Sequence, residues 1–145
     1  MSSIVDLMKY ELVYLGTPYS KYEAGIEQAF IDACKLAAVL LRAGVRVYSP
    51  IAHTHPIAIH GGIDPLDHRI WLPFDAAIMR KSDAMVVGCL DGWAESEGVI
   101  HEMAEFLAMN KPRYLLNPKT LGVTTIYMEP GSWGDVKQSV SAAGR

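Results

Sequence analysis

Apolar segments alternate with segments of helical periodicity through most of the chain. Four segments are short, apolar and closed by glycine, proline or polar residues, as buried strands are: residues 11–16, 45–49, 83–90 and 112–116. A helical spacing of apolar residues predicts helices over about residues 20–44, 71–81 and 97–110. Strands joined through helices by right-handed crossovers become parallel, so this order predicts an α/β fold. We expect a single doubly wound, mostly parallel sheet of four or five strands, Rossmann-like or flavodoxin-like, with helices on both faces.

Local signals set the expected ends of these elements. Ser20 and Glu23 have the spacing of a capping box, which predicts that the first helix begins there. Pro73 fits a helix only within its first turn, so Asp75 is expected near the third helical position. Residues 50–70 are rich in His, Gly and Pro and are predicted to form a long loop. A loop of that length in a compact domain is usually functional or mobile.

The pattern weakens in the last third of the chain. Residues 121–128 are predicted either to add an edge strand or to pack against a neighbouring molecule. Residues 139–145 are expected to be a frayed tail. The length of 145 residues fits one domain, which we place at residues 1–138.

Composition and charge exclude several classes of function. A net charge of −3 provides no basic surface for a nucleic-acid polymer. Two cysteines make neither a disulfide framework nor a zinc site of four thiolates. No segment has the ~18–20 apolar residues of a membrane span, and the first residues lack a signal-peptide pattern. We therefore expect a small acidic protein of the cytoplasm that does not bind membranes.

Four of the five histidines fall within the predicted loop and invite a metal hypothesis; they are His53, His55, His60 and His68. No carboxylate or thiolate completes a recognised metal-ligand spacing, and the HEXXH motif is absent. The sequence therefore predicts neither a metal nor a cofactor.

The most informative candidate site follows the third predicted strand, because open parallel sheets bind ligands beyond the carboxyl ends of their strands. There, Ser96 and Gly98 enter a helix whose free amides and dipole attract anions. Glu102 lies one turn further along, and helical side chains lean toward the N-terminus, so its carboxylate is expected over Gly98. Ser96 equally suits an ordinary N-cap and Glu102 a solvated helix face. Their position after this strand favours the functional interpretation.

Other candidates have structural alternatives as well. Asp75 can act in catalysis, or it can simply complement the dipole at a helix start. Tyr14, inside the first predicted strand, is by default a core residue. Trp93 can stack on a base or fill a gap. Asp83 falls at the amino end of its strand, away from any ligand, so a structural cap is favoured.

Four motifs together resemble the nucleoside 2-deoxyribosyltransferases and the related 2′-deoxynucleoside 5′-phosphate N-hydrolases. They are YLGTPYS, FDAAIMRKSDAMVV, SEGVIHE and AEFLAMNKPRYLL, and they extend over roughly residues 11–117. Asn110 stands where that family has a glycine. The order and spacing of the four motifs carry the resemblance.

The resemblance implies a role for each matching residue. Glu102 corresponds to the glutamate that attacks the anomeric carbon, and Asp75 to the aspartate that protonates or orients the leaving base. Tyr14 corresponds to a tyrosine that holds the glutamate or the sugar. Ser96 corresponds to a position that is aspartate in the transferases, and serine contacting the 5′-phosphate in the N-hydrolases. Asn117 is a candidate contribution to the pocket of a neighbouring subunit.

The implied activity is cleavage of an N-glycosidic bond, by hydrolysis or base transfer, in a nucleoside or nucleoside 5′-monophosphate. Gly16, Thr17, Gly98 and Trp93 are the further expected substrate contacts, and a homo-oligomer, dimer or tetramer, is the expected assembly. Glu95 and Glu97 flank Ser96, so an unphosphorylated nucleoside is an alternative substrate. A non-catalytic nucleotide- or nucleotide-sugar-binding domain stays an alternative, because fold alone does not confer activity.

Overall fold

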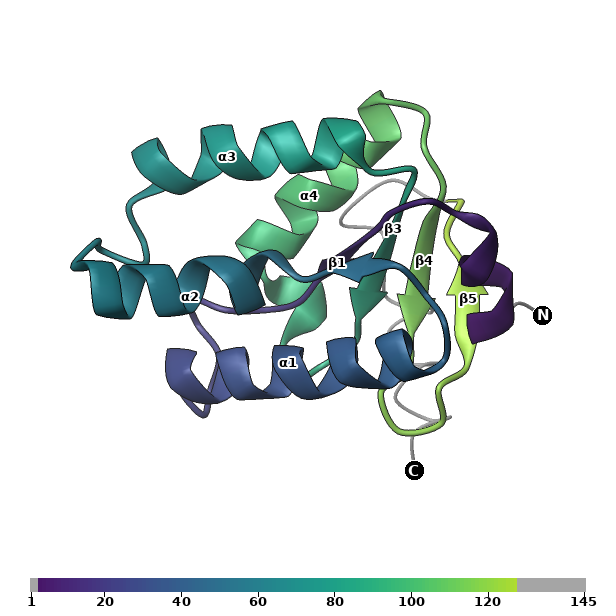
Figure 1. Ribbon diagram of the computed structural model, residues 1–145, viewed down its shortest axis with the longest axis horizontal. Coiled ribbons are helices and arrows are strands. Elements are labelled where there is room, and N and C mark those ends of the chain that lie inside the picture. Colours follow the sequence, from purple (N-terminus) through teal and green to yellow (C-terminus); the bar gives the residue numbers. More distant parts are fainter. Residues whose placement is uncertain (1–2, 128–145) are drawn as a thin grey trace.

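A five-stranded sheet lies at the centre of the computed structural model, which describes residues 3–127 (Figure 1). The strand order is β2-β1-β3-β4-β5, that of flavodoxin-like sheets. The strands are β1 (Val13–Gly16), β2 (Val47–Tyr48), β3 (Ala84–Gly88), β4 (Arg113–Leu116) and β5 (Val123–Thr125). The first four pair in parallel, whereas β5 adds an antiparallel edge. The predicted sheet and its edge strand are confirmed, while the tail expected at 139–145 lies outside the described residues.

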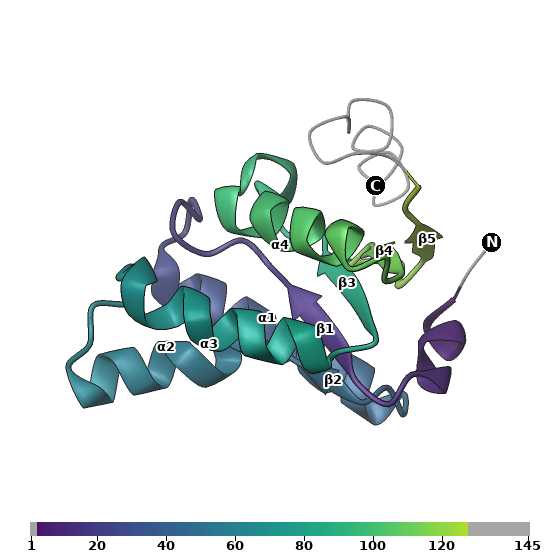
Figure 2. The same ribbon diagram turned by 90° about the horizontal axis from the view of Figure 1, so that it is seen from above.

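Helices cover both faces of this sheet, as predicted. They are α1 (Ile26–Arg42), α2 (Pro50–Gly61), α3 (His68–Lys81) and α4 (Glu97–Ala108), with the short 3₁₀ helices η1 (Ile4–Lys9) and η2 (Trp93–Glu95). Figure 2 shows α1 and α4 on opposite sides of the strands. Among residues 3–127, no helix is both long and apolar enough to cross a membrane.

The alternation of side chains along β1 divides the core into two clusters. Val13 and Leu15 pack against α1, where Leu40 is fully buried. Tyr14 faces the other way, toward Phe106 of α4 and the C-terminal half of α3. Successive strand residues point to opposite faces, so a tyrosine between two aliphatic residues is directed to the second cluster. Tyr14 therefore lies on the face of the sheet covered by α3 and α4, the helices that hold the candidate acids.

The first helix begins later than its sequence predicts. Its N-cap is Gly25, with φ of 95°, and Ser20 lies in a preceding turn. That segment is organised by two turns, in which the amide of Tyr22 donates to Tyr19 O at 3.1 Å and the amide of Gly25 donates to Tyr22 O at 2.9 Å. The left-handed conformation at Gly25 redirects the chain into the helix. The predicted capping box at Ser20 is therefore wrong.

The predicted long loop over residues 50–70 is also wrong, because its first half is α2. Pro50 occupies the first turn and Ser49 caps it, accepting from the amide of Ala52 at 3.2 Å. The helix ends before Gly62, which is left-handed with φ of 72°. Pro56 lies inside the helix and broke the helical pattern in the sequence.

The next helix, α3, starts earlier than predicted. Asp67 caps it, accepting from the amide of Arg69 at 3.1 Å, and Pro73 lies within it, beyond the first turn. Proline lacks the N–H that would bond the carbonyl four residues earlier, here that of Arg69. Both residues are exposed, so water can bond that carbonyl. As a result, Asp75 lies in the middle of the helix instead of near its third position.

Candidate active site

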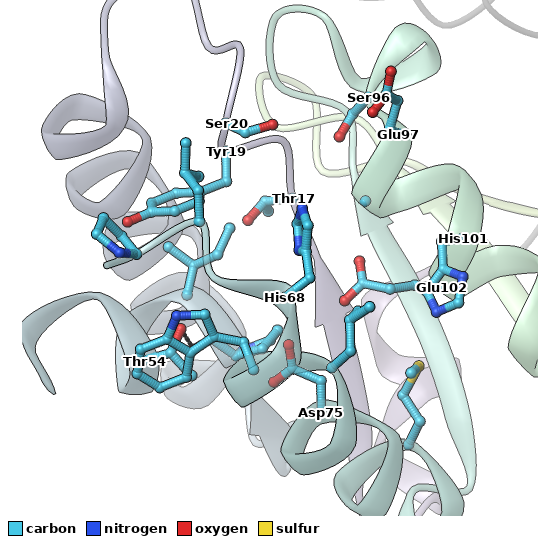
Figure 3. A pocket seen from close by; sticks show the side chains of 18 residues that line it. Thr17, Tyr19, Ser20, Thr54, His68, Asp75, Ser96, Glu97, His101 and Glu102 are labelled. Carbon is cyan, nitrogen blue, oxygen red and sulfur yellow. Dashed lines mark hydrogen bonds between the residues drawn. The ribbon is translucent and has the colours of Figure 1, made fainter. Parts of the chain in front are cut away.

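A cavity of about 280 Å³ opens at the carboxyl ends of the parallel strands. The segment after β1, the start of α2, the middle of α3 and the start of α4 line it (Figure 3). Doubly wound sheets bind ligands at this end, where the crossovers from neighbouring strands leave to opposite faces. The volume lies near the lower end of the ~300–1,000 Å³ typical of small-molecule sites. The cavity is of a size for one small ligand.

Glu102 points into this cavity from the second turn of α4 (Figure 3). Tyr14 donates a hydrogen bond from its fully buried phenol to Glu102 Oε2. Gly16, two residues further along β1 on the same face, leaves the space that the carboxylate occupies. A Cβ at Gly16 would lie 3.2 Å from Glu102 Oε1 and 2.5 Å from Met85 Cε. Because side chains alternate along β1, Tyr14 and Gly16 face the same side of the sheet. The first donates a hydrogen bond to Glu102, and the second leaves space for its carboxylate.

Asp75 approaches the same cavity from α3, so the two candidate acids converge (Figure 3). Burial raises the pKa of Glu102 to about 8; the hydrogen bond from Tyr14 opposes this and the charge of Asp75 adds to it. Burial also raises the pKa of Asp75 to about 6. Burial and the neighbouring carboxylates raise the pKa of Tyr14 well above its ordinary value, so its phenol remains a donor.

Three buried polar atoms near the acids have no hydrogen-bond partner within residues 3–127. They are Thr17 Oγ1, Tyr48 Oη and Asp75 Oδ1. Thr17 is only 4% exposed and lines the cavity with Asp75. Burial, with a smaller effect from the charge of Asp75, raises the pKa of Tyr48 to about 12. Buried polar groups are nearly always paired in native proteins, so these atoms indicate a site completed by water or a ligand.

The start of α4 forms another wall of the cavity. Ser96 is its N-cap, and its Oγ accepts from the amide of Val99 at 3.4 Å. Gly98 leaves open space, since a Cβ there would meet nothing nearer than Ser96 Oγ at 4.0 Å. Glu97 lines the mouth and pairs with Lys21 at 3.3 Å, both side chains being well exposed. Ser96, Gly98 and Thr17 therefore lie where the sequence places substrate contacts.

Two expected contacts lie elsewhere. Trp93 is buried among the core residues between the sheet and α4, so its ring fills the core and lines no part of the cavity. Asn117 follows β4, where its Oδ1 accepts from the amides of Lys119 and Thr120 at 2.9 and 3.1 Å. Asn117 thus caps a turn away from the cavity of its own chain. Asp83 has the expected structural role, since its Oδ2 accepts from the amide of Leu12 at 3.1 Å.

The matched sequence range coincides with the part of the chain that builds this cavity. The sequence model of a family described as a domain of unknown function, DUF1937, matches residues 11–117. This chain belongs to the DUF1937 family. The range contains β1 to β4, both acids and every residue that lines the cavity. No curated protein matches the sequence.

Sequence reasoning missed one wall of the site in this DUF1937 domain. The missed residues come from the segment after β1, from the region predicted to be a loop and from the first position of the predicted helix over residues 71–81; they are Tyr19, Thr54, His68 and Trp71. The available signal for α2 was Ser49 followed by Pro50, an N-cap followed by proline at the first helical position. In the described part of the chain, no group of three or more His, Cys, Asp or Glu side chains could hold a metal ion.

The raised pKa of Glu102 has a consequence for the stability of the DUF1937 domain. The folded protein holds this proton up to about pH 8, whereas an ordinary glutamate loses it near pH 4.5. The unfolded chain therefore binds fewer protons in this window, and folding stability falls as pH rises through it. We expect Glu102→Gln to be more stable than wild type at pH 8 by about 1 kcal/mol or more.

Urea unfolding at pH 5 and pH 8 measures this effect. The gain from Glu102→Gln should be larger at pH 8, because the wild-type carboxyl is protonated at pH 5 in the folded state. Glu105→Gln, at an exposed position of the same helix, is the matched control and should give no such difference. Equal gains at both pH values would contradict the raised pKa.

Proposed function

We propose that this DUF1937 domain cleaves the N-glycosidic bond of a nucleoside or nucleoside 5′-monophosphate, by hydrolysis or by transfer of the base. The observation that carries the proposal is the convergence of the Glu102 and Asp75 carboxyl groups, with Tyr14 bonded to Glu102, in one cavity. The resemblance of four sequence motifs to deoxyribosyltransferases and N-hydrolases supports the same chemistry. The proposed reaction needs no cofactor.

In the first step, a carboxylate oxygen of Glu102 forms a bond to C1′ of the sugar as the bond from C1′ to the base nitrogen breaks. The electron pair of the broken bond goes to the base, which takes a proton from Asp75. The transition state resembles an oxocarbenium ion, and the negative charge of Glu102 stabilises it. Tyr14 fixes the orientation of the carboxylate, which favours attack from one side.

In the second step, a water molecule or a second base attacks C1′, and the bond from C1′ to Glu102 breaks. The electron pair returns to the carboxylate of Glu102. The proton released by the water, or by the ring nitrogen of the incoming base, goes to the carboxylate of Asp75, which restores the acid for the next turnover. Hydrolysis and base transfer therefore use the same two side chains and differ only in the attacking group.

The two pKa values predict a bell-shaped dependence of kcat/KM on pH. Below about pH 6 both acids are protonated and the nucleophile is lost; above about pH 8 both are ionised and the proton donor is lost. Between these values the pair holds one proton, mainly on Glu102, and the minor state with ionised Glu102 and protonated Asp75 is the active form. Measuring kcat/KM from pH 5 to 9 tests this.

Asp75→Asn provides the control for that profile. Removal of the acid should abolish the alkaline limb, since no proton donor remains to be lost. Its acidic limb should then report the pKa of Glu102 alone, which should lie below the wild-type value of about 8 because the charge of Asp75 no longer raises it. An alkaline limb that persists in Asp75→Asn would contradict the assigned acid.

The start of α4 bears on whether the substrate carries a phosphate. Free amides at a helix N-terminus and the hydroxyl of Ser96 suit an anion, and Gly98 leaves it room. Glu97 places a negative charge beside them, and its pairing with exposed Lys21 offsets that charge only weakly. The proposal therefore includes both nucleosides and their 5′-monophosphates. A cytoplasmic location and a dimer or tetramer stay predictions.

The direct test is a panel of ribonucleosides, deoxyribonucleosides and their 5′-monophosphates, with chromatography of the released base. Free base that accumulates with wild-type protein supports the glycosidase; base that moves to a second, added base supports transfer. Calorimetry on the same panel covers the alternative. Tight binding of a nucleotide without any release of base would instead identify a non-catalytic binding domain.

A further inference from the structure

On the side of the cavity opposite Glu102, with Asp75 between the two sides, two of the hydroxyl groups have a hydrogen-bond partner within the protein (Figure 3). They belong to Tyr19 and Thr54. Thr54 Oγ1 donates its only hydrogen to the carbonyl of Pro50, inside α2, at 2.9 Å. Toward the cavity, Thr54 therefore presents lone pairs and no hydrogen.

The hydroxyl hydrogen of Tyr19 is likewise donated to a partner within the protein, a buried histidine. His55 Nε2 lies 2.8 Å from Glu27 Oε2, and His55 Nδ1 lies 2.5 Å from Tyr19 Oη. An ionised carboxylate only accepts hydrogen bonds, so a neutral imidazole in this position carries its proton on Nε2. Nδ1 is then the acceptor, and Tyr19 must donate to it. The carboxylate of Glu27 thus dictates which way the Tyr19 hydroxyl points.

The His55 imidazole, which sets the direction of the Tyr19 hydroxyl, is fixed in position by burial and stacking. His55 is 3% exposed, and its ring stacks on that of Phe30 with centroids 4.6 Å apart. Burial raises the pKa of Tyr19 to about 12, with Glu27 as the second cause, so its hydroxyl stays protonated and donates to the ring. A ligand that reaches Tyr19 therefore finds an acceptor.

The remaining walls of this end suit a flat, largely apolar group. Ile51, Pro65, Leu66 and Trp71 contribute apolar surface, and His68 adds a polar side chain from the start of α3. The indole N–H of Trp71 also points elsewhere, donating to the carbonyl of Asp64 at 2.9 Å. Trp71 lies one turn before Asp75 on α3, beside the acid expected to protonate the leaving base. This end of the cavity is therefore the place for the base, on the assumption of the proposed function.

We propose that this end of the cavity selects a heteroaromatic base with an exocyclic amino group, such as adenine or cytosine, over the base with a carbonyl at that position. The two hydrogens of an amino group match the acceptors on Tyr19 and Thr54. A carbonyl oxygen in the same place would face lone pairs and lose the hydrogen bonds it makes in water. The discrimination arises because the hydroxyl hydrogens of Tyr19 and Thr54 both point to other protein atoms and not into the cavity.

Adenine and hypoxanthine form a matched pair for the test, because they differ mainly in having an amino group or a carbonyl at one ring position. Neither has a glycosidic bond, so their binding is independent of catalysis. Calorimetry at about pH 7.5 should give adenine an affinity about 10-fold or more above that of hypoxanthine. Cytosine and uracil should show the same order.

Variants identify the groups responsible. Tyr19→Phe and Thr54→Val each remove one acceptor with little change of shape, and each should lower the ratio of adenine to hypoxanthine affinity several-fold. Tyr22→Phe is the matched control, because Tyr22 is on the same segment but donates to Asp32 at 2.7 Å, outside the cavity. It should leave the ratio as in the wild type.

The direction of the Tyr19 hydroxyl has its own readout. Nitrogen-15 chemical shifts of His55 should show a protonated Nε2 and an unprotonated Nδ1. The opposite tautomer, equal affinity for adenine and hypoxanthine, or no binding of either base would each overturn the inference. Base preference without cleavage of any nucleoside would overturn only the glycosidase; cleavage with equal affinities would overturn only the base preference.

Discussion

Replacement of Glu102 by alanine is expected to lower kcat for base release by about 1,000-fold or more, the scale seen when a nucleophile is removed from other enzymes. In the proposed mechanism, the variant lacks the carboxylate that forms the bond to C1′ and stabilises the positive charge of the sugar. Released base, quantified by chromatography at saturating substrate, measures the loss. Glu105→Ala, at an exposed position of the same helix, should retain wild-type activity.

A covalent intermediate distinguishes a nucleophile from a purely electrostatic role. A nucleoside with fluorine at C2′ destabilises the oxocarbenium-like state and slows breakdown of the intermediate. Wild-type protein should gain the mass of the fluorinated sugar on the peptide that contains Glu102, and Glu102→Gln should gain none. Labelling of another residue, or Glu102→Ala activity close to wild type, would contradict the assigned nucleophile.

Asp75→Asn is expected to lower kcat/KM by about 100- to 10,000-fold on a nucleoside with an ordinary base, the usual contribution of a general acid. The loss should depend on the leaving group. A base that already carries a positive charge, such as N7-methylguanine, departs without taking a proton. The variant should therefore cleave an N7-methylated nucleoside with nearly wild-type kcat/KM.

Comparison of the two substrates in one variant separates chemistry from damage to the fold. A misfolded or misaligned site would lose both activities together. Asp91→Asn, at an exposed position after β3, is the matched control and should leave both activities intact. If Asp75→Asn lost equal activity on both substrates, Asp75 would be a residue that orients the substrate and not the proton donor.

The strands β1, β3 and β4 were predictable because they are buried throughout and nearly all of their residues are apolar. Met85, Val86 and Val87 are all fully buried, since helices cover both faces of the sheet. The helices after β2 were not predictable in the same way. Pro56 and Pro73 lie inside α2 and α3, and tertiary contacts stabilise these helices despite the lost backbone hydrogen bonds. Propensity rules alone therefore misplace both helices.

The same distinction between local and tertiary information applies to the candidate site. Glu102 and Gly98 are four residues apart on one helix, so local geometry was enough to relate them. The placement of Asp75 opposite Glu102 depended on the resemblance to a family, because nothing local links the two. The contact between Tyr19 and His55 joins residues 36 positions apart through a helix that the sequence did not reveal. Such contacts need the three-dimensional arrangement.

The alternation along β1 has a consequence for redesign of this protein. Tyr14 and Gly16 position Glu102 from a strand near the middle of the sheet, whereas Tyr19, Thr54 and Trp71 lie on segments beyond the strand ends. In the proposed mechanism, the nucleophile and the contacts to the base are therefore held by separate parts of the chain. A library confined to residues 50–72 could change the accepted base while the reacting carboxylate keeps its support.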